Sequence, residues 1–348
     1  MMNQIKRSME SYPSSRNGWR KAAVAVAASM TLLLSACAST PTDKGDPSNT
    51  AAPELKTVRV AIAPTGTALP MVVADKQGLF KKYGLDATYE VSNVTISDQL
   101  ATLGRQFDIA MGTQPALIMA RAQGVPIVEI TSGALDTKAN PQVAIVASEK
   151  SGIKSLADLG GKTVGTLSLS GNIHYALMYA AKKQGVDLST IKWVVGTVPQ
   201  LPDQLKANRV DAIEEIEPFA SIAIANGGVS LGDPFQAVGE VFGVWLSTSD
   251  WADKNEDTIN RFTKAMAEAS AWIADNQDEA REILGSYTGS KGEVLAKTPI
   301  PDFQFQTSGT ELAAKQRPDL ETWITILKET DGFSGSVKVD DLLPSWAK

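Results

Sequence analysis

Three short polar turns carry the groups in this sequence that could bind a small anion or polar solute. They span residues 64–67, 112–114 and 168–172. Each follows a β-branched apolar run and precedes a helical pattern, so its free backbone N–H groups and hydroxyl or amide donors would lie at a helix N-terminus. The helix dipole attracts negative charge there, and an oxyanion could be held without Arg or Lys. Ser, Thr and Asn also simply cap helices, and that alternative stays open for all three turns.

These turns supply most of the candidate ligand-binding residues. They are Thr65, Gly66, Thr67, Gly112, Thr113, Gln114, Ser168, Ser170, Gly171 and Asn172.

A group of carboxylates, residues 214–217, follows a predicted strand and adds the last two candidates, Glu215 and Glu217. These two alternate with Ile216, so they share one face of the strand. Carboxylates there could bind an amino group or a nitrogen heterocycle, which would argue against a bare anion such as nitrate. The alternative is that at least two of the three are solvated charges at the end of a strand.

Composition excludes several other kinds of chemistry. The chain has 348 residues, one Cys, one His and a formal net charge of −6. One Cys forbids an intramolecular disulfide, and together with one His it excludes the common zinc and iron-sulfur ligand sets. No long basic run is present, which argues against a nucleic-acid partner. No nucleophile-acid pattern surrounds His174 in the sequence, so we interpret it as a hydrogen-bond donor on a helix face or at the rim of a cleft. We expect no catalytic residue, no metal and no cofactor. Trp245 and Phe242 could line a binding site, but Trp245 is expected in the core.

The single Cys, Cys37, follows an N-terminal segment that is typical of an export signal. A basic stretch precedes a small and apolar run at residues 22–34, which is too short to cross a bilayer. Residues 34–37 read Leu-Ser-Ala-Cys and resemble the bacterial lipobox, in which the Cys is acylated and becomes the first residue of the mature chain. We therefore expect a signal peptide at residues 1–36, a tether at residues 37–55 and a lipid on Cys37; an ordinary signal peptide is the alternative.

Beyond residue 57, short β-branched runs alternate with helical patterns, which is typical of an α/β fold with mainly parallel strands. The predicted strands are residues 58–62, 86–91, 107–111, 127–130, 143–147, 163–167, 191–195, 212–216 and 240–247. The predicted helices between them are residues 69–82, 97–106, 114–122, a short one within 152–162, one opening at 172, and 201–207 and 218–226.

The C-terminal third is predicted to be helical. Asn255 is a plausible N-cap for a helix with an apolar stripe from Ile259 to Ile273. A second helix is expected at residues 278–284 with Gly285 as its stop, and a third at residues 318–328 beginning at a Pro.

The order of local motifs resembles the solute-binding proteins of ABC importers, in the group that includes nitrate, alkanesulfonate and taurine receptors and thiamine-pyrimidine-like proteins. The matching segments are residues 69–86, 107–112, 152–162, 209–212 and 217–219. The resemblance covers nearly all of residues 57–345. Each motif alone is weak, but their order over so long a stretch is specific for the family and says little about the ligand.

The resemblance implies a type II periplasmic-binding-protein fold, with two α/β lobes joined by a two-strand hinge and a ligand cleft between them. Lobe 1 would comprise residues 56–145 plus 246–348, and lobe 2 residues 146–245. Hinge closure would couple ligand occupancy to shape, because the solute binds the closed form better.

The function that the resemblance implies is an extracytoplasmic, lipid-anchored receptor, monomeric and not an enzyme. It would capture a small organic or oxyanionic solute, such as a sulfonate, nitrate or taurine, and deliver it to an ABC permease and its ATPase. One alternative is a receptor for a pyrimidine or thiamine precursor or an aromatic carboxylate. Another is a sensor or scaffold lipoprotein. An enzyme related to this family makes the thiamine pyrimidine with a Cys-rich iron motif, which this sequence lacks.

Overall fold

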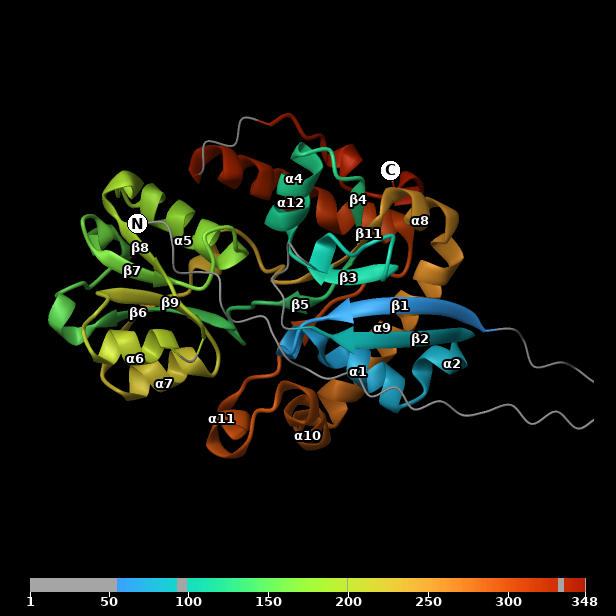
Figure 1. Ribbon diagram of the computed structural model, residues 1–348, viewed down its shortest axis with the longest axis horizontal. Helices are drawn as coiled ribbons and strands as arrows, with labels where there is room; N and C mark the ends of the chain where they lie inside the picture. Colours follow the sequence, from blue (N-terminus) through green and yellow to red (C-terminus); the bar gives the residue numbers. More distant parts are fainter. Residues whose placement is uncertain (1–54, 93–98, 199, 331–334, 348) are drawn as a thin grey trace, which may run out of the picture. The chain divides into compact units, whose positions relative to one another are not determined.

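The structure, a computed structural model, describes residues 55–92, 99–198, 200–330 and 335–347. The predicted signal peptide, Cys37 and most of the tether lie outside the described residues. Within those residues, no helix is long and apolar enough to cross a bilayer. The described chain contains two five-stranded sheets covered by helices, so the α/β architecture with two sheets is confirmed (Figure 1).

The first sheet has the strand order β2-β1-β3-β11-β4. Its strands are β1 Lys56–Ile62, β2 Leu85–Val91, β3 Ile109–Gly112, β4 Ile127–Ser132 and β11 Val244–Thr248. β1 runs parallel to β2 and β3, whereas β11 lies antiparallel between β3 and β4. The chain thus returns to the middle of this sheet after it has built the second one.

Side-chain alternation along β1 divides the first sheet's core into two faces. Val58, Val60 and Ile62 pack with one cluster, whereas Ala61 packs with another. The first face is covered by α1 Leu69–Lys76, α2 Leu79–Lys82 and α9 Glu256–Asp275. The second is covered by α4 Gln114–Ala122 and α12 Gly309–Thr330.

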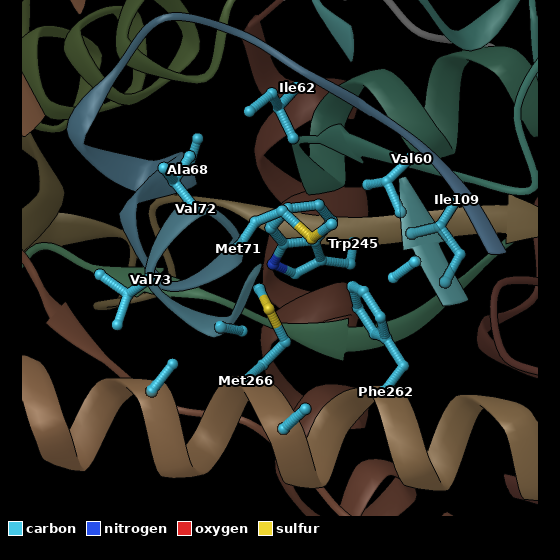
Figure 2. Packing of buried hydrophobic residues seen from close by; sticks show 14 of the residues in the cluster. Val60, Ile62, Ala68, Met71, Val72, Val73, Ile109, Trp245, Phe262 and Met266 are labelled. Carbon is cyan, nitrogen blue, oxygen red and sulfur yellow. The ribbon is translucent and has the colours of Figure 1, made fainter. Parts of the chain in front are cut away.

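Trp245 lies at the centre of the first cluster. Figure 2 shows its indole beside Met71, Met266 and Phe262. The ring centroids of Trp245 and Phe262 are 5.7 Å apart in an edge-on arrangement, and Trp245 is 1% exposed. The expectation that Trp245 belongs to the core is therefore confirmed.

The second sheet has the strand order β10-β6-β9-β7-β8. Its strands are β6 Val143–Ser148, β7 Thr163–Thr166, β8 Lys192–Val195, β9 Ala212–Ile216 and β10 Gly228–Gly232. One face is covered by α5 Asn172–Lys183, and the other by α6 Gln200–Lys206 and α7 Phe219–Ala225. The sequence did not predict β10, an edge strand whose Gly-rich, half-exposed residues lack a clear apolar alternation.

Two crossover segments connect the sheets and lie against each other. The first contains β5 Ala134–Leu135, which pairs with β12 Asp302–Phe303. The second contains the 3-10 helix η5 Pro234–Ala237 and returns to β11. An antiparallel bridge joins Leu135 to Val241, so the two segments are paired side by side. α5, which covers one face of the second sheet, also packs against η5 and against α12.

The remaining helices of the described chain have 3 to 12 residues each. They are α8 Ser249–Lys254, α10 Gln277–Thr288, α11 Gly292–Lys297, η1 Gly66–Ala68, η2 Glu149–Ser151, η3 Leu156–Leu159, η4 Leu188–Thr190, η6 Val339–Asp341 and η7 Ser345–Ala347.

Several predicted helix boundaries are wrong, each for a local reason. The helix expected at 69–82 is interrupted at Gly78, whose φ of 68° is left-handed. α10 continues through Gly285 and ends at Gly289, which has φ 76°. Pro318 lies inside α12 and does not start it. By contrast, Asn255 does lie at the N-cap of α9, as predicted, although its side chain donates to the Trp251 carbonyl and makes no cap bond.

The helix expected at residues 97–106 is only partly testable. Residues 97 and 98 lie outside the described part of the chain. Gln99 and Leu100 are helical, and a turn follows, closed by a bridge between Leu103 and Phe107.

Candidate functional site

A cavity of about 180 Å³ lies where the strand ends of both sheets and both crossovers meet. It is lined by Ala63, Thr65, Gly66, Thr67, Gln99, Met111, Gly112, Thr113, Gln142, Asn172, Ile216, Glu217, Phe242, Gly243, Thr298, Pro299 and Pro301. Ligands of open α/β sheets bind beyond the carboxyl ends of the strands, and β1, β3 and β9 all end here.

The turn after β1 forms one wall, and all three of its predicted residues line the cavity. The hydroxyl oxygens of Thr65 and Thr67 are 2.8 Å apart and hydrogen-bonded. The Tyr287 hydroxyl donates to the Thr65 carbonyl at 2.7 Å, and burial holds the pKa of Tyr287 well above its usual range. A Cβ on Gly66 would lie 3.2 Å from Pro301, so a glycine lets the loop of Pro301 approach closely.

The turn after β3 contributes Gly112 and Thr113 but not Gln114. The Thr113 hydroxyl accepts from the Ala116 N–H at 3.4 Å and so caps α4. Gln114 is buried, and its amide donates at 3.1 Å both to Glu129 and to Gln316 of α12. Gln114 therefore belongs to a polar network on the far side of α4.

The turn after β7 contributes only Asn172. Its amide donates to the Phe242 carbonyl at 2.9 Å, which joins α5 to the second crossover. Ser168, Ser170 and Gly171 lie outside the cavity. The hydroxyl oxygens of Ser168 and Ser170 are 3.3 Å apart, and Ser170 lines a separate groove.

The carboxylates of β9 point to opposite faces of the second sheet. Glu214 is buried on the α5 side, where it accepts from the Thr166 hydroxyl and, at 3.0 Å, from the Leu167 N–H. His174 Nδ1 lies 3.8 Å from its second oxygen. Glu214 thus fixes the start of the turn after β7.

Glu215 lies on the opposite face and is fully buried, outside the cavity. One of its oxygens accepts from the N–H of Ile216 at 3.0 Å, and no partner is found for the other within the described chain. Burial, with Glu214 and Glu217 nearby, raises the pKa of Glu215 to about 9. Glu215 is therefore a protonated acid at neutral pH.

Among the described residues that line the cavity, Glu217 is the one whose side chain can ionise. Its carboxylate oxygens accept from the backbone and the hydroxyl of Ser221 in α7, at 3.1 and 3.0 Å. Its N–H donates to the Gln142 carbonyl at 2.9 Å, which ties the end of β9 to the first crossover. Among the described residues that line the cavity there is no Lys, Arg or His.

About half of the residues that line the cavity were not predicted from the sequence. Gln99 and Gln142 belonged to no motif, and Met111 lay in a segment that matched the family but was not named as a site residue. The Pro-rich segment at residues 298–301 reaches the cavity from the C-terminal third, which the sequence analysis interpreted only as helices. Phe242, considered as a possible wall residue, does line the cavity.

His174 and the acidic groups give no sign of a metal centre. His174 is buried, and its ring packs edge-on against Trp193 at 4.4 Å. Within the described ranges, no group of three or more His, Cys, Asp or Glu side chains could hold a metal ion.

Comparisons with known proteins identify the family and the fold. A family model described as NMT1/THI5 like matches residues 66–280, more than half of the chain. The chain is 26% identical, over 71% of its length and 76% of the relative's, to a Haemophilus influenzae protein named for thiamine biosynthesis. It is 26% identical, over 58% of its length and 62% of the relative's, to an Escherichia coli protein named for binding aliphatic sulfonates.

A solved structure shares the fold. The periplasmic aliphatic sulphonate binding protein of Escherichia coli superposes with a TM-score of 0.69 at 21% identity, over 84% of this chain and 97% of that one. The predicted periplasmic-binding-protein fold is therefore confirmed. The cavity of the chain lies at the ends of the strands. Because the family model matches residues 66–280, the chain belongs to the NMT1/THI5-like family.

Proposed function

We propose that this protein is an extracytoplasmic receptor of an ABC importer, which captures a small solute in the cavity and delivers it to a permease and its ATPase. The observation that carries the proposal is the lining itself, which comes from the strand ends of both sheets and from both crossovers. A solute held there touches every part that a hinge motion would displace. The relatives named for sulfonate binding and the shared fold support the same role.

Hinge closure is the mechanism that this arrangement supports. The two lobes would be the parts of the chain built around the first and the second sheet, with the paired crossovers as the hinge. The bounds expected from the resemblance, residues 56–145 plus 246–348 and residues 146–245, fall inside β6 and β11 and shift to the ends of those strands. A solute that contacts Thr67 on one side and Asn172 on the other binds the closed form more tightly than the open one. By mass action it shifts the population toward the closed form, which a permease can distinguish.

The character of the lining favours one class of solute. Amide groups of Gln99, Gln142 and Asn172 are combined with apolar walls. Glu217 adds a carboxylate, and no cation accompanies it among the lining residues that the structure describes. A bare anion would meet a negative charge with no compensating positive one. This supports the alternative of a neutral or amine-bearing organic solute, such as a pyrimidine, over nitrate or a sulfonate.

The lining also supports a receptor over an enzyme. Among the described lining residues the possible base is the Glu217 carboxylate, and its hydrogen bonds go to Ser221 and not to a Thr hydroxyl. A catalytic role would require a base within hydrogen-bond distance of the attacking group.

Membrane anchoring through Cys37 is proposed from the sequence. The protein should fractionate with membranes when Cys37 is present, and Cys37→Ser should release it, because acyl chains on that residue supply the anchor. Retention of the Cys37→Ser chain in the membrane fraction would contradict the proposal.

Thermal unfolding of the Cys37→Ser chain with candidate solutes tests the function. The panel contains an aminopyrimidine, taurine, an alkanesulfonate, an aromatic carboxylate and nitrate. A solute that binds only the native state raises the melting temperature in proportion to the logarithm of its concentration. We expect the aminopyrimidine to give the largest shift and nitrate none. No shift with any of the five would overturn the proposed range of solutes.

A further inference from the structure

Asn140 and Gln142 form a hydrogen-bonded pair on the first crossover. Pro141 lies between them and restricts Asn140 to an extended backbone, so the side chains at positions 140 and 142 leave the chain on the same side. Gln142 Nε2 donates to the Asn140 carbonyl at 3.0 Å and to Asn140 Oδ1 at 3.1 Å. An amide nitrogen carries two hydrogens, and both are therefore used within this pair.

Backbone carbonyls fix the orientation of both amides. A carbonyl oxygen only accepts, so the atom of Gln142 that faces the Asn140 carbonyl must be the nitrogen. Asn140 Nδ2 donates to the Ile300 carbonyl at 2.7 Å, so Asn140 Oδ1 is the atom that faces Gln142. The free end of the Gln142 amide is therefore its oxygen.

This oxygen, Gln142 Oε1, is an acceptor on the cavity wall. It accepts no hydrogen bond within the described chain, and it is not fully buried. Gln142 as a whole is 6% exposed and lines the cavity, so the oxygen is available to a solute there.

Asn172 shows the same arrangement beside the second crossover. Its Nδ2 donates to the Phe242 carbonyl at 2.9 Å, which fixes the nitrogen. Among the described residues, Asn172 Oδ1 has no donor, and it is not fully buried. Each crossover thus holds one amide nitrogen and leaves one amide oxygen for the cavity, where the Glu217 carboxylate is a further acceptor.

Gln99 supplies a donor in the same cavity. The residue is 3% exposed, and its Nε2 is buried without an acceptor in the part of the chain that the structure describes. A buried donor without a partner costs free energy, and an acceptor on the solute would remove that cost. The solute that fits therefore carries N–H donors for the amide oxygens and an acceptor for Gln99.

We propose that Asn140 is a positioning residue that turns the oxygen of Gln142 toward the cavity, and that Gln142 and Asn172 thereby select a solute whose planar amide, amidine or urea group donates N–H. This selection rests on the proposed function, whose range of solutes it narrows. The orientation of Gln142 does not depend on that function and can be tested without a solute.

Nuclear magnetic resonance of side-chain NH2 groups in the Cys37→Ser chain tests the orientation. Gln142→Met identifies the Gln142 proton pair by its loss. Asn140→Ala should move one proton of the pair to the position of a free amide, because the Asn140 carbonyl alone is left to accept. Asn140→Asp keeps a side-chain acceptor and should leave the pair closer to its original position. If Asn140→Ala fails to fold, Asn140→Ser replaces it. A pair that does not move in that variant overturns the orientation.

Benzamidine, benzamide and benzoate test the selection, because they share one shape and differ in hydrogen-bond character. Benzamidine donates, benzamide donates and accepts, and benzoate accepts. Benzamidine and benzamide should raise the melting temperature of the Cys37→Ser chain, and benzoate should not. Asn140→Ala should weaken benzamide binding about five-fold, as expected for the loss of one oriented hydrogen bond. A shift with benzoate as large as with benzamide, or no shift with any of the three, overturns the selection.

Asn276→Ala is the matched control. Asn276 Nδ2 donates to the Trp272 carbonyl at 2.8 Å, as Asn140 Nδ2 does to that of Ile300, but Asn276 is not among the described residues that line the cavity. The control should change neither the Gln142 resonances nor benzamide binding. If it weakens binding as much as Asn140→Ala does, the positioning role is wrong.

The two levels of the proposal fail in different ways. A response to nitrate or an alkanesulfonate without one to benzamide would overturn the selection and leave the receptor function supported. No response to any solute, with the Gln142 resonances as expected, would contradict the receptor function and leave the orientation of Gln142 supported.

Discussion

The turns that follow β1 and β3 line the cavity with hydroxyl and backbone groups. The similar turn that follows β7 is instead hydrogen-bonded to a side chain buried within the second sheet. Glu214 accepts from Thr166 and Leu167 and so anchors that turn, and only Asn172 beyond it reaches the cavity. The polar groups of the turns in the first sheet thus face the cavity, whereas those at the start of the turn in the second sheet bond to a buried side chain of that sheet. What separates them is whether a buried carboxylate lies beneath the turn.

Removing that carboxylate should give the largest effect. Glu214→Ala leaves the Leu167 N–H and the Thr166 hydroxyl buried without their acceptor, which should cost about 3–5 kcal/mol of unfolding free energy. Urea unfolding at pH 7 measures the loss. Glu214→Gln, which keeps an acceptor oxygen, is the control and should lose less. Equal stability of Glu214→Ala and the parent would show that the turn does not depend on Glu214.

Replacing Glu215 by Gln should raise stability, whereas replacing Glu214 by Ala should lower it. Its pKa is about 9 in the folded chain against an ordinary value of 4.5, so the folded state holds a proton that the unfolded state has lost. Glu215 therefore does not reduce the free energy of unfolding below pH 4.5. Its cost to that free energy grows as the pH rises from 4.5 toward 9. Glu215→Gln should not show this fall and should exceed the parent by about 2–4 kcal/mol at pH 8, judging from the shift in protonation.

Urea unfolding of both chains at pH 4, 6 and 8 checks this prediction. The two stabilities should converge at pH 4. Parallel pH profiles for parent and variant would contradict it.

Two glycines in equivalent turns offer a third test. A Cβ at Gly112 would lie 2.4 Å from Leu246 Cδ1 in the core, whereas at Gly171 the nearest atom is 3.5 Å away. Gly112→Ala should therefore destabilise the protein by about 1–3 kcal/mol through overpacking. Gly171→Ala, which has φ −80°, should be nearly neutral. Similar losses for both would mean that the two turns are packed alike.

Solute affinity should show the smallest effect. Thr67→Ala removes a hydroxyl from the cavity wall and should weaken binding about five-fold, since a hydrogen bond contributes about 1 kcal/mol. Ser170→Ala is the control, because Ser170 lies outside the cavity. Isothermal titration with the solute that gives the largest melting shift measures both. Weaker binding by Ser170→Ala than by Thr67→Ala would place the site at the turn after β7.

The sequence predicts those parts of the fold that depend on local pattern. α4 begins and ends as expected, since Thr113 caps it and its apolar face repeats at helical spacing. Local rules fail where tertiary contacts decide. Gly285 is accommodated within α10, and the network formed by Gln114, Glu129 and Gln316 could not be foreseen because its members are distant in sequence.

The cavity was predictable only in part for the same reason. The turns at its wall follow predicted strands, so a rule about strand ends finds Thr65, Thr67 and Thr113. The rule cannot tell which turns face inward, because that depends on Glu214, a residue on another strand. Nor does it find Pro301, which is brought to Gly66 by the packing of α10 and α11.

The place of β11 in the first sheet has a consequence for the order in which the chain can assemble. All five strands of the second sheet are contiguous in sequence, so that sheet can complete its pairing as soon as β10 is available. The first sheet cannot, because β11 lies between β3 and β4 and comes more than a hundred residues after β4. Long loops close slowly and leave strand edges unpaired in the meantime. The half of the molecule that is begun first is therefore finished last.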